Sequence, residues 1–122
     1  MCPRICSAAV AAIGVCLLGT SAIRAATFSS AYYDPQTNEL VVTLIYGGTN
    51  ADHQFSLQWG ACHPLGDTGH QIVGEVLDSQ WNDAAKQSFT KTVRFGLGGL
   101  TCRPATVTLR TAPRYETTLQ IP

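Results

Sequence analysis

The sequence contains little charge. Only 13% of its 122 residues are Asp, Glu, Lys or Arg, and the formal net charge is +0. This balance excludes a polybasic nucleic-acid-binding protein and an acidic, solvating tail. Because 45% of the residues are hydrophobic, the composition is also not that of an intrinsically disordered chain. A chain of this length is expected to form one compact domain and no second.

The N-terminal apolar run is too short to cross a membrane. It covers residues 5–19, which are 15 residues without charge, whereas a membrane-spanning helix needs about 20. The run follows Arg4 and passes into small residues, an order typical of a secretory signal peptide. An uncleaved membrane anchor is the alternative. No twin arginine precedes the run, so the sequence lacks the mark of the twin-arginine export route. We therefore predict a signal peptide over residues 1–26.

The remaining residues, 27–122, are predicted to form the single mature domain. Because secretory signals are cleaved after small residues, three alanines are candidate cleavage positions. They are Ala22, Ala25 and Ala26. We expect a periplasmic or secreted protein that has no stable membrane span after cleavage.

Cysteine becomes scarce once the signal peptide is removed. Three of the five cysteines lie within it, and Cys62 and Cys102 remain. An even pair in an exported chain predicts one disulfide, which would close a loop of about 40 residues. Two free thiols or a metal-binding pair are the alternatives, but no Cys-x-x-Cys spacing supports a metal site.

A helical repeat of apolar residues is absent from the mature chain, and an alternation with period two takes its place. Phe55, Leu57 and Trp59 alternate with polar residues, and Val107 and Leu109 do the same. β-branched and aromatic residues dominate these segments, which is typical of half-buried strands. The expected strands cover residues 27–33, 39–46, 53–59, 70–78, 88–95, 104–111 and 115–121.

Turns rich in Gly, Asn and Asp separate the expected strands. About seven short strands with this spacing predict an all-β domain, a small antiparallel β-sandwich with an Ig-like outline. Residues 79–86 are the one segment expected to form a short helical turn, with Ser79 as its cap. Cys62 follows one strand and Cys102 precedes another, so the disulfide is expected to join strand ends rather than to cross the core.

Motifs for catalysis are lacking. No serine lies in a nucleophile-elbow pattern, and no glycine-rich loop precedes a helix that would bind phosphate. Glu75 and Asp78 lie on one expected strand and would point to opposite faces, which is poor geometry for paired carboxylates. We therefore expect a protein that is not an enzyme, with no catalytic residues and no cofactor.

Three histidines, His53, His63 and His70, lie near one another in the sequence. Imidazole is a common ligand of Zn, Cu and Ni, so one hypothesis is a metal-binding β-sandwich that uses these three residues. Their spacing matches no metal motif. His53 also continues the inward stripe, the row of every second residue expected to face the core, that Phe55 and Leu57 form. This favours a partly buried, hydrogen-bonded histidine instead.

Basic residues are absent from residues 26–83, which hold seven acids, whereas residues 86–122 hold six bases and one acid. A basic surface formed by late strands would bind an anionic partner, and Arg94 and Arg103 are its candidate binding residues. We favour the alternative, in which early acids pair with late bases, because a Greek-key sandwich mixes early and late strands. The mature chain is slightly negative, which argues against nucleic-acid binding.

Trp81 lies in a polar loop beside Gln80, Asn82 and Asp83. An exposed Trp among polar groups is typical of a binding anchor, although the alternative is a Trp that folds back over the sandwich end. The loop favours an exported non-enzymatic binding protein, such as an inhibitor, immunity or accessory module, with a protein or glycan partner in the cell envelope. A structural surface subunit that exchanges edge strands is a further hypothesis.

The intact mass of the exported protein tests the signal peptide. We expect a chain that starts directly after Ala22, Ala25 or Ala26, because export removes the apolar leader. Mass spectrometry of protein recovered from the cell envelope or the medium gives this mass directly. A chain that still begins with Met1 would contradict the prediction.

Overall fold

The computed structural model describes residues 26–111 and 115–122, and the predicted signal peptide lies, except for Ala26, outside them. The described residues form eight strands, and no helix among them is long and apolar enough to cross a membrane. Seven strands agree with the predicted ones to within two residues at each end. The strands are β2 (Thr27–Asp34), β3 (Glu39–Gly48), β4 (Phe55–Trp59), β5 (His63–Pro64), β6 (His70–Asp78), β7 (Gln87–Gly96), β8 (Ala105–Thr111) and β9 (Tyr115–Ile121).

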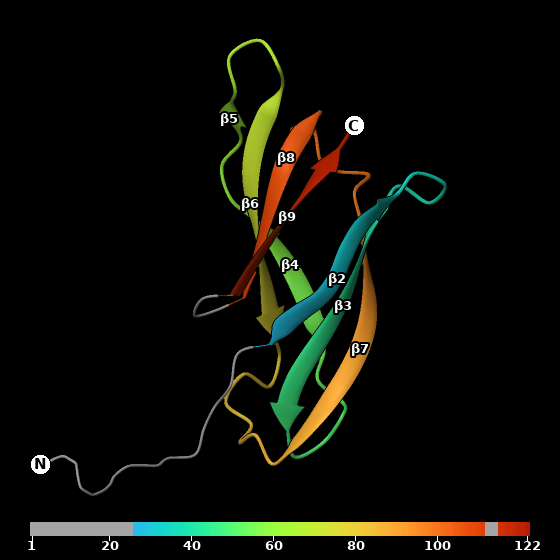
Figure 1. Ribbon diagram of the computed structural model, residues 1–122, viewed down its shortest axis with the longest axis vertical. Helices are drawn as coiled ribbons and strands as arrows, with labels where there is room; N and C mark the ends of the chain where they lie inside the picture. The colour runs from blue at the N-terminus through green and yellow to red at the C-terminus, as the bar shows by residue number, and fades with distance from the viewer. Residues whose placement is uncertain (1–25, 112–114) are drawn as a thin grey trace, which may run out of the picture.

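The strands form two sheets that pack against each other (Figure 1). One sheet has the order β2-β3-β7, and the other has the order β4-β6-β8-β9 with β5 beside β6. All pairs are antiparallel except β6–β8, in which Ile72 lies opposite Val107. The chain leaves β6, passes through β7 of the other sheet and returns as β8, and a parallel pair requires such a crossover. The predicted all-β sandwich is confirmed, with one parallel pair among the antiparallel ones.

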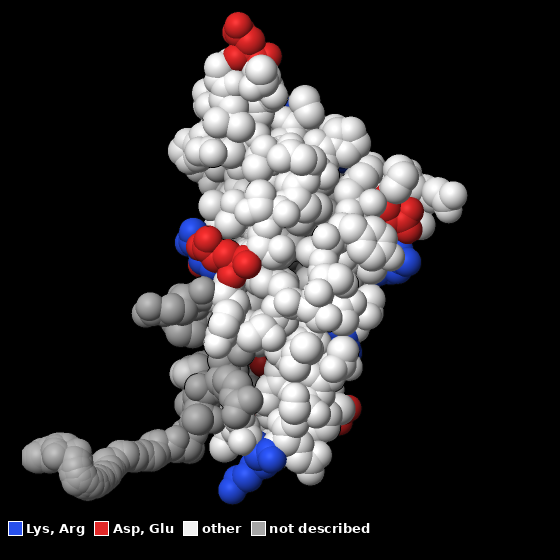
Figure 2. Space-filling view, viewed as in Figure 1, with Lys and Arg blue, Asp and Glu red and all other residues white. Residues whose placement is uncertain are grey.

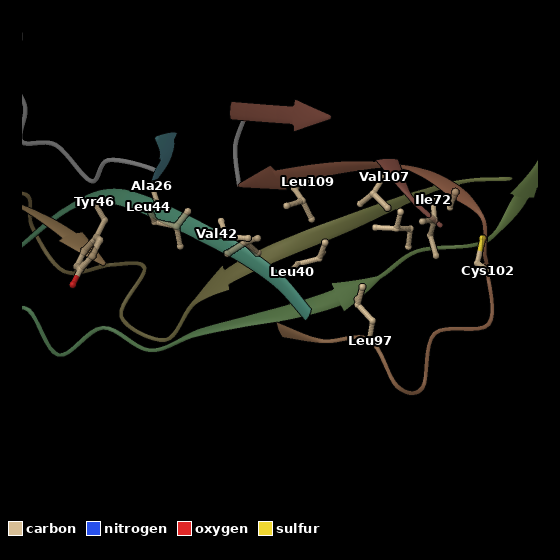
Figure 3. Packing of buried hydrophobic residues seen from close by; sticks show 13 residues of the cluster. Ala26, Leu40, Val42, Leu44, Tyr46, Ile72, Leu97, Cys102, Val107 and Leu109 are labelled. Atoms are coloured by element: carbon tan, nitrogen blue, oxygen red, sulfur yellow. The ribbon is translucent and has the colours of Figure 1, made fainter. Parts of the chain in front are cut away.

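The core lies between the sheets and consists of inward stripes of apolar residues (Figure 3). Leu40, Val42 and Leu44 of β3 are fully buried, and so are Val107 and Leu109 of β8. Each buried side chain of this size stabilises the fold by about 1.5–3 kcal/mol relative to an exposed one. Since β3 and β8 are interior strands of their sheets, these stripes hold the two layers together along their middle.

Gly74 in the middle of β6 makes room for a large aromatic side chain. A Cβ atom at this position would lie 2.9 Å from Leu57 Cδ1, 3.0 Å from Trp59 Cζ3 and 3.2 Å from Leu109 Cδ2. Trp59, which the alternation places in the core, packs against the buried cluster and is itself partly buried. A glycine occurs within this strand because neighbouring side chains occupy the space of a methyl group.

Residues 79–86 form a turn over residues 79–82 followed by irregular chain, rather than the helical turn that the sequence suggested. The Ser79 hydroxyl does not cap a helix, because its Oγ accepts a hydrogen bond of 3.0 Å from the Gln54 N–H. The Ser79 N–H in turn donates to the Gln54 carbonyl at 2.8 Å. The polar side chain that favours a helix start in the sequence therefore binds a neighbouring loop instead.

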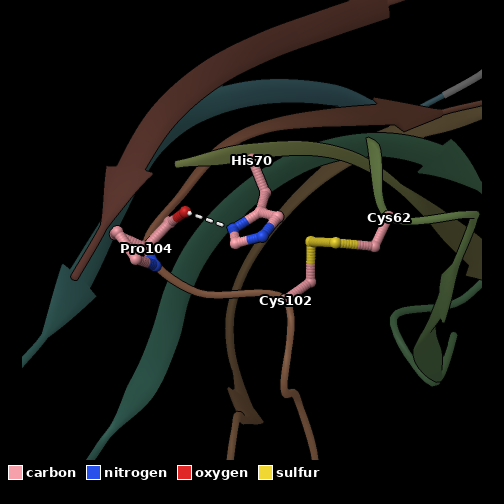
Figure 4. Close-up of a disulfide and its surroundings, with 4 residues drawn as sticks. All are labelled: Cys62, His70, Cys102 and Pro104. Carbon is pink, nitrogen blue, oxygen red and sulfur yellow. Dashed lines mark hydrogen bonds between the residues drawn. A yellow bond between two sulfur atoms is a disulfide. The ribbon is translucent and has the colours of Figure 1, made fainter. Parts of the chain in front are cut away.

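The predicted disulfide between Cys62 and Cys102 is present (Figure 4). It joins the segment after β4 to the segment before β8, with the two Cα atoms 5.8 Å apart. Cys102 is only 5% exposed, whereas Cys62 is exposed. As the sequence predicted, the bond ties strand ends at one end of the sandwich rather than crossing its middle.

Early acids pair with late bases, as their distribution along the sequence predicted. Arg94 Nη1 lies 3.2 Å from Asp34 Oδ2 and 3.0 Å from Glu39 Oε1. Arg110 Nη1 lies 3.9 Å from Glu75 Oε2. On the face drawn in Figure 2, red and blue atoms lie side by side at two places and most of the remaining surface is uncharged. Arg94 is thus part of a cross-strand cluster that contains both acidic and basic side chains.

The disulfide is expected to contribute strongly to stability. Replacing both cysteines, Cys62→Ser with Cys102→Ser, should lower the free energy of unfolding by about 4 kcal/mol, the loop-entropy value for a separation of 40 residues. Urea denaturation followed by tryptophan fluorescence measures the difference. A loss below about 1 kcal/mol would contradict this expectation and would mean that the bond restricts the unfolded chain much less than the loop-entropy model requires.

Candidate functional site

The candidate site lies at the end of the sandwich where β3 and β6 end and β4 and β7 begin (Figure 1). Two connecting segments meet there, residues 49–54 after β3 and residues 79–86 after β6. Together they contain a buried histidine, several acids and amides, and an exposed tryptophan. The disulfide lies at the opposite end of the molecule, near the start of β6.

His53 connects the two segments from the inside. It is 0% exposed, and the Tyr46 ring packs on it with the ring centroids 5.0 Å apart. Nδ1 of His53 lies 2.7 Å from Asp78 Oδ2, and Nε2 lies 2.9 Å from Asp83 Oδ2. The structure therefore contains the hydrogen-bonded histidine that the inward stripe favoured, and it is buried completely.

The two contacts of His53 require a protonated ring. A neutral imidazole has one N–H and one lone pair, so it donates to only one of two carboxylates. The imidazolium donates to both and satisfies the observed distances. Burial by itself lowers the pKa of His53, but the hydrogen bonds to Asp78 and Asp83 and their charges outweigh burial and raise the pKa above 6.5. The site is thus a cation held between two anions.

Asp83 is the acid on which most of these contacts converge. Its Oδ1 accepts from the Thr49 hydroxyl at 2.7 Å, and its Oδ2 accepts from the Thr49 N–H at 2.7 Å as well as from His53. The hydrogen bonds from His53 and Thr49 lower the pKa of Asp83 to about 2. Because both donors belong to the first segment and Asp83 belongs to the second, this carboxylate joins the two.

Gly48, the last residue of β3, leaves space for the ion pair. A Cβ atom here would lie 2.6 Å from Asp83 Oδ2 and 2.6 Å from His53 Nε2. At the preceding Gly47, a Cβ atom would lie 2.7 Å from Ala85 Cβ. The two consecutive glycines therefore let the second segment lie directly against the end of β3.

Amide side chains add further contacts between the segments. Asn50 Nδ2 donates to Gln80 Oε1 at 3.0 Å, and Gln80 Nε2 donates to the Asp52 carbonyl at 3.2 Å. The Gln80 N–H also donates to Asp78 Oδ1 at 2.9 Å. The residue that precedes Trp81 is thus fixed through both its side chain and its backbone.

Trp81 is displayed on the outside of this hydrogen-bond network. It lies in a turn closed by a hydrogen bond of 3.0 Å from the Asp83 N–H to the Gln80 carbonyl, and it is 68% exposed. The side chain therefore does not fold back over the end of the sandwich. An aromatic side chain on a turn with fixed flanks loses little conformational freedom when it binds a partner.

The two candidate binding arginines lie away from Trp81. Arg94 pairs with Val41 near the start of β3, whereas the Trp81 turn lies at the other end of that strand. Arg103 Nε donates to the Pro122 carbonyl at 2.9 Å, and its guanidinium carbon lies 5.8 Å from the centroid of the Tyr33 ring. The structure does not bring these three predicted binding residues onto one surface.

The three histidines do not converge either. His53 contacts Asp78 at the end of β6, whereas His70 is the first residue of that strand and His63 pairs beside it on β5. A strand of nine residues separates its ends by about 26 Å, at about 3.3 Å per residue. No single metal ion can therefore be bound by all three imidazoles in this fold.

Sequence reasoning missed the two acids that hold His53. Asp78 lies two positions after Val76 and so continues the inward stripe of β6, and this was the available signal. Asp83 lies in an irregular segment, 30 positions from its histidine partner, and no periodicity marks it. A histidine on an inward stripe predicts that partners exist, but it does not say which acids they are.

The His53 cluster is expected to determine how stability depends on pH. Stability should fall as pH rises above 6.5, because a raised pKa means that the folded state loses the imidazolium it favours. It should also fall as pH drops from 3.8 toward 2, where Asp83 becomes protonated. His53→Gln should remove the alkaline decrease and lower the free energy of unfolding by about 2 kcal/mol, because both acids lose their cation. Thermal unfolding at a series of pH values measures both effects.

The matched control is His63→Gln, since His63 is exposed and lies at the other end of the sandwich. This variant should keep the wild-type profile. An alkaline decrease that persists in His53→Gln would contradict the role given to the imidazolium.

The chain matches no family model, no curated protein and no solved structure. Its function is therefore inferred from the geometry of its own residues. Those residues form a hydrogen-bonded pair of segments that displays one exposed indole, Trp81.

Proposed function

We propose that this protein is an exported, non-enzymatic binding protein that recognises a protein or glycan partner in the cell envelope through Trp81. The observation that carries the proposal is an indole that is 68% exposed on a turn fixed by the His53–Asp83 contact. Exposed aromatic side chains on fixed loops are frequent binding anchors, because they bury a large area at little cost in conformational entropy. An inhibitor, immunity or accessory module would use such a surface.

Polar groups next to the indole support recognition of a specific partner. Asn82 and Asp52 are exposed in the same pair of segments, and Gln80 lies directly before the indole. An aromatic ring supplies the apolar contact, and amide and carboxylate groups beside it supply directional hydrogen bonds. This combination fits a folded protein surface or the alternating polar and apolar faces of a sugar.

The state of His53 supports binding rather than catalysis. Both of its ring nitrogens are bonded to carboxylates and the residue is fully buried, so no ring atom is free to exchange a proton with a substrate. Asp83 already accepts hydrogen bonds from Thr49 and from His53. In the proposed function, these groups serve only to hold the turn that carries Trp81.

Two independent features support export. A disulfide between Cys62 and Cys102 persists in an oxidising compartment and is rare in the cytosol. The order of charge, apolar run and small residues in the first 26 positions is typical of a secretory signal. The proposed partner is therefore sought in the cell envelope.

Paired capture experiments test the proposal. Immobilised wild type and Trp81→Ala are exposed separately to a cell-envelope protein extract and to purified cell-wall polysaccharide. We expect one protein or one glycan to be retained at least about tenfold better by the wild type, the effect of losing an aromatic hot spot. The two arms distinguish a protein partner from a glycan partner.

The matched control is Tyr115→Ala, which removes another exposed aromatic side chain, one that is 45% exposed on β9. It should retain the partner as the wild type does. If Trp81→Ala retains everything that the wild type retains, the proposed binding role of Trp81 is wrong.

A further inference from the structure

A second group of reactive side chains lies at the disulfide end of the sandwich (Figure 4). A ring nitrogen of His70 and the sulfur atoms of Cys62 and Cys102 all lie within 4.8 Å of one another. Among residues 26–111 and 115–122, no other set of three or more His, Cys, Asp or Glu side chains places its ligand atoms this close. The binding role of Trp81 makes no use of this group.

The His70 ring is oriented by the carbonyl of Pro104. Nδ1 lies 3.2 Å from that oxygen, and the His70 backbone N–H donates to the same oxygen at 3.0 Å. Because a carbonyl oxygen only accepts, Nδ1 carries the proton of the neutral ring. The lone pair is then on Nε2, which lies on the side of the disulfide in Figure 4. A metal-ligating histidine usually has its other nitrogen bonded in this way.

Gly69 allows the close approach that orients the ring. Its φ is +117°, and a Cβ atom there would lie 2.9 Å from the Pro104 oxygen. The Leu65 N–H donates to the Gly69 carbonyl at 2.8 Å and so closes the loop before His70. The backbone of this loop therefore orients His70 through contacts that do not involve either cysteine.

Sheet hydrogen bonds also hold the two cysteine segments in place. The Gly60 N–H donates to the Val73 carbonyl at 2.7 Å just before Cys62, and His63 pairs with Gln71 just after it. On the other side, the residues after Cys102 enter β8, which pairs in parallel with β6 from its first residue. We therefore expect the two sulfurs and the imidazole to stay close together when the S–S bond is opened.

We propose that reduction of the Cys62–Cys102 disulfide converts this group into a binding site for a thiophilic cation, Zn²⁺ or Cu⁺. A dithiol reductant supplies two electrons and two protons, so that the protein disulfide becomes two thiols and the reductant becomes a disulfide. The cation then displaces the two thiol protons and is bound by both thiolates and by His70 Nε2. The disulfide and the bound cation therefore exclude each other.

The chemistry of the three ligands selects the cation. Thiolates favour Zn²⁺ and Cu⁺ over the hard cations Mg²⁺ and Ca²⁺, and imidazole is compatible with both. Two thiolates with one neutral imidazole balance the charge of Zn²⁺. Cys62 is exposed while Cys102 is buried, so solvent reaches the group from the side of Cys62.

Metal titration of the reduced protein tests the proposal. The chain is reduced with a phosphine, which adds no competing thiol, and Zn²⁺ is titrated against a chromogenic chelator. The wild type should bind one Zn²⁺ per chain only when reduced, and His70→Gln should bind at least about tenfold more weakly. His63→Gln removes an exposed histidine of the neighbouring strand and should bind as the wild type does.

Two further measurements separate ligand loss from unfolding. Circular dichroism of each reduced protein before titration reports whether the strands persist. Zn²⁺ should raise the unfolding temperature of the reduced wild type and of reduced His63→Gln by more than that of reduced His70→Gln. If reduced His70→Gln loses its strands, NMR of the reduced wild type decides instead, because Zn²⁺ should shift the His70 ring resonances.

Four results would overturn the proposal. The first is that the reduced wild type loses its strand signal, and the second is that it binds Zn²⁺ no more tightly than the double variant Cys62→Ser with Cys102→Ser does. The third is that folded His70→Gln binds Zn²⁺ as tightly as the wild type does, and the fourth is that the His70 ring resonances do not move when Zn²⁺ is added. Each of these outcomes would mean that the imidazole and the two sulfurs do not act as one ligand set.

Discussion

A buried imidazolium between two carboxylates determines how one end of this sandwich is built. His53 contacts Asp78 at 2.7 Å and Asp83 at 2.9 Å, and these two acids flank the turn that displays Trp81. The contacts require that Gly48 has no side chain. Because opposite charges attract more strongly inside the protein than in water, a few hydrogen bonds fix a polar segment that has no hydrophobic core of its own. The proposed binding surface depends on this arrangement.

The strands could be predicted because period-two alternation directly specifies a buried face. Val42, Leu44 and Val107 are fully buried at the positions that the alternation requires. The disulfide was predicted from the even number of cysteines left in a chain with a predicted signal peptide. The parallel pairing of β6 with β8 could not be predicted in this way, because it depends on β7 joining the other sheet, and no stripe specifies which sheet a strand joins.

The candidate site was less predictable than the fold. The place of His53 on an inward stripe indicated that it needs polar partners, yet Asp83 meets it only because two loops approach in the folded chain. Residues 79–86 carry helix-start signals, but contacts with residues 49–54 use the same polar groups and replace the helical turn. At the disulfide end, similarly, the loop before β6 places His70 beside the sulfur of Cys102, which lies 32 positions away in the sequence.

The protonation state of His53 is the most direct test of the central claim, that a cation between two acids holds the Trp81 turn in place. Nitrogen-15 NMR of the imidazole ring, followed as pH is raised, reports whether each ring nitrogen carries a proton. We predict that both nitrogens stay protonated as pH passes 6.5, with the midpoint above that value, because the raised pKa of His53 reflects its two carboxylate partners. A midpoint at or below 6.5, or a nitrogen without a proton at lower pH, would contradict the account.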